Sequence, residues 1–217
     1  VSNGSTVHYF SYQNENMGYA PSIPTQYFEN TEGLSLGSEE YLSGSGSYSS
    51  GYIALASSSD FDMPYDPNGF PQTIAIRYPD ITTSKTSIQF ASISMHIKQI
   101  PADTGDVVIK ISGEKQANSS AFSTTSHDIT NRTKTTNSVL WDIPNGAVGE
   151  VLATPDLSTI VQEIMDLSSW SSGNPICFIF ERDNATSTST ATRHFSQDGE
   201  HVTIDGVNYE TPLFSLR

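Results

Sequence analysis

The chain has 217 residues, of which 35% are hydrophobic and 16% are charged. This length suffices for one all-β domain or two small domains. The net charge of −14 argues against a nucleic-acid-binding protein, because phosphate binding needs a basic surface. An anionic membrane surface would repel the same charge. We therefore expect divalent cations, neutral or cationic surfaces, or other copies of the chain as partners.

Residues 1–50 differ from the rest, because aromatic side chains are interspersed with Ser, Gly and Asn. Tyr and Phe supply large contact areas at a modest entropic cost, which suits an interface as well as a core. The sequence thus predicts an N-terminal arm, lying either on its own domain as extra edge strands or on a neighbouring subunit. The candidate interface residues are Tyr9, Phe10, Tyr12, Tyr19, Tyr27 and Phe28.

Acidic residues accumulate in the N-terminal third, where no Lys or Arg precedes Arg77. This pattern is typical of a solvated acidic face, and the alternative is a cation-dependent contact surface. One short stretch offers hard oxygen ligands of the kind that Ca²⁺ prefers, namely Asp60, Asp62, Asp66 and Asn68. The spacing does not match an EF-hand, and Asp-Pro-Asn-Gly also favours an ordinary turn. Calcium is the one cofactor that the sequence suggests.

From Tyr52 onward, short apolar runs alternate with turn signals and predict antiparallel strands. The expected strands cover residues 52–56, 61–63, 73–78, 87–100, 107–111, 138–141, 176–180, 201–204 and 213–216. In the long strand the alternation slips by one residue near Ala91 and Ser92, which indicates a β-bulge. This pattern predicts an all-β fold, a jelly-roll-like antiparallel sandwich over residues 51–217.

One segment, at about residues 155–167, has the pattern of a helix. Its apolar stripe at helical spacing comprises Leu157, Ile160, Val161 and Ile164. Thr154 is the expected N-cap, and Pro155 suits the first helical position. Trp170 and a Gly-Asn turn then lead into the apolar run 176–180. This order predicts a helix that caps one end of the sandwich and leads into a central strand.

No catalytic motif is evident in the chain. The five histidines accompany no nucleophile elbow, zinc motif or phosphate loop, and they are His8, His96, His127, His194 and His201. The single cysteine, Cys177, lies in an apolar run, where a buried inert thiol is expected. The sequence therefore predicts a non-catalytic protein.

The sequence also contains candidate charge pairs and glycosylation sequons. Glu114 and Arg132 are expected to meet in a charge-assisted bridge across a loop, and Arg77 and Glu163 are further candidates for such pairing. Sequons at Asn3, Asn118, Asn131 and Asn184 permit N-glycosylation in a eukaryotic secretory pathway. The start at Val1, without Met, is as expected of a secreted protein after signal removal. No segment resembles a transmembrane span.

From about Tyr52, the residue order resembles extracellular modules of marine bacteria and unicellular eukaryotes. These modules are related to the carbohydrate-binding β-sandwich domains called DNRLRE domains. The matching positions are 76–78, 86–90, 111–114 with Asn118 and Phe122, 131–132, 139–141, 154–157 with Ile160, 162–164, Trp170, 172–174 and 211–213. The resemblance implies a secreted or surface-attached module without catalysis, and core positions for the two tryptophans. The residues expected to have structural roles are Arg77, Glu114, Arg132, Trp141, Glu163, Trp170 and Asn174.

The sequence thus predicts an extracellular structural or adhesive module, a subunit of a cell-surface or filament assembly. The N-terminal arm and the strand edges are expected to join one copy to the next. The alternative is a module that binds an algal or cell-wall polysaccharide, with or without calcium.

Overall fold

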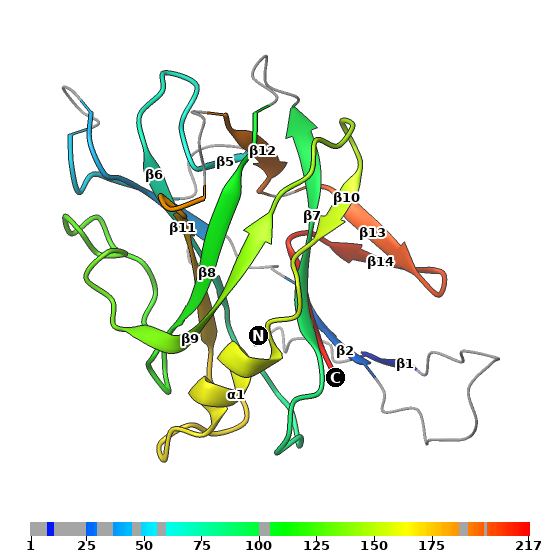
Figure 1. The fold of residues 1–217 in the computed structure, drawn as a ribbon. Helices are drawn as coiled ribbons and strands as arrows, with labels where there is room; N and C mark the ends of the chain where they lie inside the picture. The colour runs from blue at the N-terminus through cyan, green and yellow to red at the C-terminus, as the bar shows by residue number, and fades with distance from the viewer. Residues whose placement is uncertain are drawn as a thin grey trace.

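The computed structural model of the protein describes residues 8–10, 25–29, 37–44, 49–55, 60–99, 105–186, 191–197 and 199–217. These residues form a β-sandwich of antiparallel strands with one short helix (Figure 1). The predicted all-β class and its single helix are confirmed. Among the described residues, no helix has the length and apolar character needed to cross a bilayer.

In the first sheet, sheet I, the last strand of the chain lies between two strands that come much earlier in the sequence. Its order is β1 (His8–Phe10), β2 (Thr25–Phe28), β15 (Leu213–Leu216), β7 (Ala91–Gln99), β12 (Arg193–Ser196) and β5 (Asp60–Met63), and β10 (Val151–Ala153) also pairs with β7. β15 is therefore flanked on both sides, by β2 and by β7.

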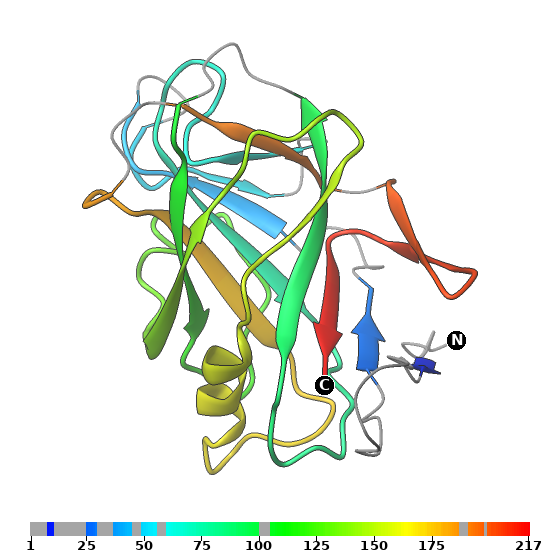
Figure 2. The ribbon, with the colours of Figure 1, turned by 45° about the vertical axis from the view of Figure 1, so that its right-hand side comes forward.

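The second sheet, sheet II, faces sheet I across the core. Its order is β4 (Ile53–Leu55), β3 (Gly37–Tyr41), β6 (Gln72–Tyr78), β11 (Ile176–Arg182), β8 (Val108–Glu114) and β9 (Lys134–Asp142). A separate hairpin, β13 (His201–Ile204) and β14 (Val207–Glu210), projects from the body (Figure 2). Asp205 and Gly206 connect its strands with positive φ angles of 51° and 81°, as a tight hairpin turn requires.

The predicted boundary at residue 50 does not separate two parts of the fold. β2 lies inside sheet I, and β3 lies between β4 and β6 inside sheet II. The described parts of the predicted arm are therefore strands of the sandwich itself. This arrangement matches the interpretation of the arm as part of its own domain, although β3 occupies an interior position rather than an edge.

The core between the sheets is rich in aromatic rings. The Tyr78 and Phe178 rings of sheet II both contact the Phe214 ring of sheet I, with centroid distances of 5.3 Å in each case. Trp141 stacks on Phe195 at 5.7 Å, which places this tryptophan in the core as expected. Ring contacts between the layers thus hold the two sheets together.

The bulge in the long strand lies slightly earlier than predicted. β7 begins at Ala91, and the backbone N–H groups of Gln89 and Phe90 both donate to the Arg217 carbonyl, at 2.7 and 3.0 Å. Two residues opposite one is the arrangement of a β-bulge. Gln89 and Phe90 therefore pair with Arg217, directly after β15, without continuing the regular strand.

Helix α1 (Ser158–Met165) is shorter than predicted and starts differently. Its apolar stripe is fully buried and packs against β7, β8 and β9 at one end of the sandwich (Figure 1). Leu157, not Thr154, is the N-cap. The Thr154 hydroxyl instead accepts the Ile93 backbone N–H at 3.0 Å and so binds the sheet. Asp156 joins the helix start to β7, because its carboxylate accepts the N–H groups of both Ser158 and Ala91.

Candidate functional site

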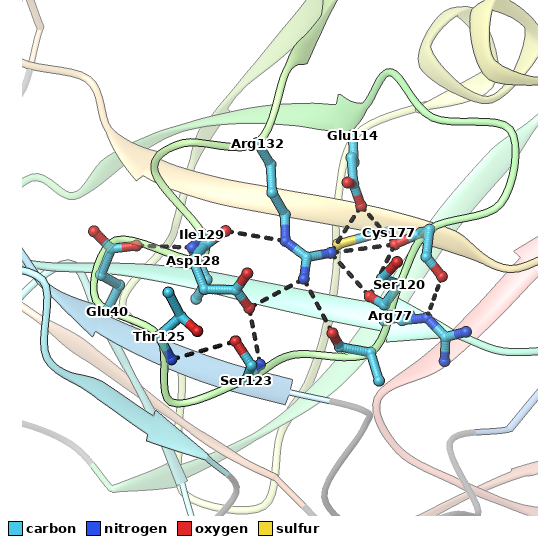
Figure 3. A network of polar contacts seen from close by, with 12 residues as sticks. Glu40, Arg77, Glu114, Ser120, Ser123, Thr125, Asp128, Ile129, Arg132 and Cys177 are labelled. Atoms are coloured by element: carbon cyan, nitrogen blue, oxygen red, sulfur yellow. Dashed lines mark hydrogen bonds and ion pairs between the residues drawn. The ribbon is translucent and has the colours of Figure 1, made fainter.

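A long connection, residues 115–133, covers the outer face of sheet II and is called the cover loop. Phe122 and Ile129 of this loop pack on Ala75, Cys177 and Ile179 of the sheet. Polar groups of the loop form the network in Figure 3. The loop therefore encloses a second, smaller core on the outside of the sandwich.

Arg132 is the centre of this network. Its Nη1 donates to Glu114 Oε2 at 2.8 Å and to the Ser120 carbonyl at 3.0 Å, while Nη2 donates to Asp128 Oδ2 at 3.1 Å (Figure 3). Its Nε donates to the Asp128 carbonyl, and its guanidinium carbon lies 4.6 Å from the Phe122 ring centroid. Only 7% of the Arg132 side chain is exposed. The predicted Glu114–Arg132 pair is thus present, and it folds the cover loop onto the sheet.

Two further predicted structural residues bind the same loop. Arg77 Nε donates to the Ser119 carbonyl at 3.0 Å, and Asn174 Nδ2 donates to the Ala117 carbonyl at 3.0 Å. Both side chains therefore contact main-chain carbonyl groups rather than carboxylates.

Glu40 binds the other half of the cover loop from β3. Its carboxylate accepts the backbone N–H groups of Ile129 and Thr130, at 2.9 and 2.7 Å. It also accepts the Thr130 hydroxyl and contacts His127 Nδ1 at 3.0 Å. Glu40 is fully buried, so this carboxylate is an internal anchor and not part of a solvated face.

Cys177 lies beneath the network and is chemically protected. Burial, followed by the charge of Glu114, raises the pKa of its thiol to about 12. A thiol must ionise to act as a nucleophile or a metal ligand. Cys177 is therefore a packing residue at neutral pH, as predicted.

A second polar cluster lies where β5 pairs with β12. In this register Asp62 is opposite His194, and Asp60 is two residues away on the same strand face. His194 Nδ1 contacts Asp62 Oδ1, and Lys98 Nζ lies 3.8 Å from Asp60 Oδ1. One ligand atom from each of Asp60, Asp62 and His194 lies within 4.8 Å of the others.

Glu39 of β3 lies beside this cluster. Its Oε1 accepts the Asp62 backbone N–H at 3.0 Å, so a side chain of sheet II satisfies the edge strand of sheet I. Burial raises the pKa of Glu39 to about 8; the Asp62 N–H opposes this shift, and the charges of Asp62, Asp60 and Asp66 add to it. Glu39 therefore keeps its proton at neutral pH.

The predicted four-residue calcium set is not assembled. Asp66 and Asn68 form a turn of their own, in which Asp66 Oδ1 accepts the N–H groups of Asn68 and Phe70 at 3.0 and 2.7 Å. Asp66 Oδ2 accepts Asn68 Nδ2 at 3.1 Å, so both carboxylate oxygens are used within the turn. The solvated acidic face is also wrong for the buried members of the N-terminal third, which are Glu39, Glu40, Asp62 and Asp66.

A shallow groove of about 610 Å³ runs beside α1 and is lined mainly by hydroxyl, amide and carboxylate side chains. Glu163 lines this groove and is fixed in position by three contacts. Its carboxylate accepts the N–H groups of Thr136 and Asn137, both at 2.8 Å, and pairs with Lys115 Nζ at 3.0 Å. Burial opposes ionisation, but these N–H groups and the Lys115 ammonium outweigh it and lower the pKa of Glu163 to about 2. Lys115 is thus the ionic partner of Glu163.

The predicted interface residues are only partly described. Phe28 is buried in the core, where its ring centroid lies 5.8 Å from that of Phe214. Its side chain is therefore not available for an exposed interface. Tyr27 is half-buried against Tyr209, with ring centroids 5.0 Å apart. Tyr12 and Tyr19, and the side chains of Tyr9 and Phe10, lie outside the described residues.

The other predicted positions are also located. Trp170 is half-buried and packs against the core, whereas the resemblance implied a position within the core. The sequon residues Asn118, Asn131 and Asn184 are exposed, and Asn3 lies outside the described residues. The three exposed positions are accessible to a glycosylating enzyme.

Comparisons with known proteins do not assign a family. No protein-family model matches the chain, and no curated protein matches it at a significant level. Any assignment of function therefore depends on the residues and contacts described above.

Proposed function

We propose that the protein is a non-catalytic structural or adhesive module of an extracellular assembly. The observation that carries this proposal is that the protein's most extensively hydrogen-bonded charged side chains bind other groups of the protein itself. The Arg132 guanidinium and the Glu40 and Glu114 carboxylates all bind groups of the fold itself. A catalytic centre requires such groups to converge on a cleft that admits a substrate. Contacts of this kind instead make a rigid unit.

An extracellular location is supported by the surface of the molecule. Asn118, Asn131 and Asn184 are exposed sequon residues, and a net charge of −14 disfavours nucleic-acid partners. Part of the predicted mechanism changes, however. β2 and β3 occupy places in their own sheets, so these segments cannot be donated to a neighbour.

The contact with the next copy is proposed to involve β1 and the residues before Thr25. β1 pairs with β2, and no other described strand pairs with it. A strand edge of this kind presents N–H and C=O groups to which another chain can add a strand. The aromatic residues of this segment, Tyr9, Phe10, Tyr12 and Tyr19, would supply side-chain contacts.

The test is a deletion of residues 1–24, which leaves β2 and β3 in place. Light scattering and sedimentation should show oligomers of the full chain and a folded monomer of the deletion variant. A variant with Leu140→Ser, which alters an exposed residue on the edge strand β9, serves as the matched surface control and should assemble normally. A deletion variant that assembles like the full chain contradicts the proposed role of the arm.

A second candidate function, polysaccharide binding, is favoured by the groove beside α1. Its hydroxyl, amide and carboxylate groups can hydrogen-bond to sugar hydroxyls. A polysaccharide array with the wild type and Thr159→Val tests this function. Binding that persists in the variant and requires no assembly would place a glycan site elsewhere on the protein.

A further inference from the structure

The pairing of β5 with β12 places three metal-ligating side chains on one face of sheet I. Asp60 and Asp62 are two residues apart in β5, so their side chains point to the same face of the sheet. His194 is the direct cross-strand partner of Asp62 in an antiparallel register. Directly opposite residues have Cβ atoms about 4.5–5.5 Å apart. The backbone itself therefore brings two carboxylates and an imidazole together.

The ligand atoms are close enough for one ion. One oxygen from each aspartate and one nitrogen from His194 lie within 4.8 Å of each other. Two ligands that each lie about 2.0–2.2 Å from a metal are separated by up to about 4.4 Å. Binding of one ion therefore requires the most distant of these atoms to lie closer together than the 4.8 Å limit.

We propose that Asp60, Asp62 and His194 bind one divalent transition-metal ion, of which Zn²⁺ is the representative. Imidazole nitrogen together with carboxylate oxygen suits Zn²⁺ and related ions, whereas Ca²⁺ takes oxygen ligands. The proposal differs from the calcium set expected from sequence in its third ligand and in its metal. It is independent of the proposed structural function.

The surroundings of the cluster support a cation site. His194 is 3% exposed, and Asp62 is the one hydrogen-bonding partner that the described residues supply to its ring. Asp60 keeps 25% of its side chain exposed, which gives an ion a route from solvent.

Lys98 is the competing group. Its ammonium lies 3.8 Å from Asp60 Oδ1 and already offsets part of the local negative charge. A bound ion must displace it, and 33% of the Lys98 side chain is exposed, so it can move into solvent. Removal of the Lys98 charge should therefore strengthen metal binding.

The test is titration calorimetry of the full chain with Zn²⁺ alone and, in parallel, with Ca²⁺ alone. We expect one Zn²⁺ per chain, bound at least tenfold more tightly than Ca²⁺. Asp60→Asn should weaken Zn²⁺ binding at least tenfold, and Lys98→Met should strengthen it. The controls Asp142→Asn and His201→Gln change exposed residues of the same types and should leave the affinity unchanged.

Because His194 is buried, its replacement can unfold the protein, so the decision does not depend on that variant alone. Asp60→Asn alters a partly exposed side chain, and circular dichroism checks that it stays folded. His194→Gln, where folded, should also lose at least tenfold in affinity. Equal Zn²⁺ affinities of the wild type and Asp60→Asn, or tighter binding of Ca²⁺ than of Zn²⁺, would overturn the proposal.

Discussion

Glu39 and Glu40 are adjacent in β3, yet their buried carboxylates bind partners on opposite faces of sheet II. Glu39 accepts the Asp62 N–H of sheet I, and Glu40 accepts the Ile129 and Thr130 N–H groups of the cover loop. Successive side chains of a strand point to opposite faces, which explains this division. Two adjacent residues thus connect sheet II to sheet I on one face and to the cover loop on the other.

Glu40→Gln should destabilise the protein by about 2–4 kcal/mol, because the amide loses the charge that several N–H and O–H donors share. Urea unfolding measures the free-energy difference. Glu200→Gln, which replaces an exposed glutamate, should change stability by less than about 0.5 kcal/mol. A loss no larger than that of this control would show that Glu40 does not anchor the loop.

Glu39 should make the free energy of unfolding fall as the pH rises. Its folded-state pKa of about 8 exceeds the ordinary value of 4.5, so the folded protein binds this proton more tightly than the unfolded chain. The associated stability is complete below pH 4.5 and is lost progressively up to about pH 8. The slope is at most about 1.4 kcal/mol per pH unit.

Glu39→Gln mimics the protonated acid and should remove this dependence. Urea unfolding of the wild type and the variant at several pH values between 4.5 and 8.5 gives the difference directly. The variant should gain stability relative to the wild type with each step in pH. Parallel curves for the two proteins would mean that Glu39 ionises normally in the fold.

Glu163 should show the opposite dependence. Its folded-state pKa of about 2 is below the ordinary 4.5, so its stabilising contribution is present above pH 4.5 and is lost as the pH falls to about 2. Glu163→Gln should therefore be less stable than the wild type at pH 7, with the gap closing in acid. Acid unfolding followed by circular dichroism measures this gap, and a constant difference from pH 7 to pH 2 would refute the assignment.

Arg132→Lys should loosen the cover loop and cost about 2–4 kcal/mol, because lysine cannot reproduce the planar set of donors. Cys177 lies under this loop, so its labelling by a thiol reagent under native conditions should accelerate. Arg217→Lys, at an exposed arginine beside the Phe90 ring, is the matched control and should label as slowly as the wild type. An unchanged rate of Cys177 labelling in Arg132→Lys would show that Arg132 does not hold the cover loop over Cys177.

Deletion of residues 1–50 should prevent folding, although the sequence suggested that residues 51–217 form a separate domain. The deletion removes β2 and β3, and with them Glu39 and Glu40. Deletion of residues 1–24 keeps these contacts and should give a folded protein. A dispersed NMR spectrum of residues 51–217 alone would contradict this expectation.

Local patterns predicted much of the fold. The apolar stripe of α1 and the expected strand at residues 73–78 depend on near neighbours in sequence, and both segments are present with buried apolar side chains. β12 was missed because Phe195 is its one apolar residue, beside Arg193, His194 and Ser196, so its sequence shows no apolar run or alternation that marks a strand. The N-cap was misplaced because the Thr154 hydroxyl binds Ile93, a partner 61 residues away.

The polar sites were less predictable for the same reason. Glu40 finds its partners about 90 residues along the chain, and His194 meets Asp62 across 132 residues. Adjacent glutamates in a polar segment look solvated, because no short-range signal reveals the strand pairing that buries them. Glu114 and Arg132 were predictable because both flank the same loop.

The position of β15 has a consequence for synthesis in the cell. Residues 213–216 fill the space between β2 and β7, which leave the ribosome long before them. In a nascent chain the edges of β2 and β7 that pair with β15 therefore stay open until residues 213–216 have left the ribosome. Such edges pair readily with wrong partners, so chaperone protection during translation should matter more for this protein than for one built from local hairpins.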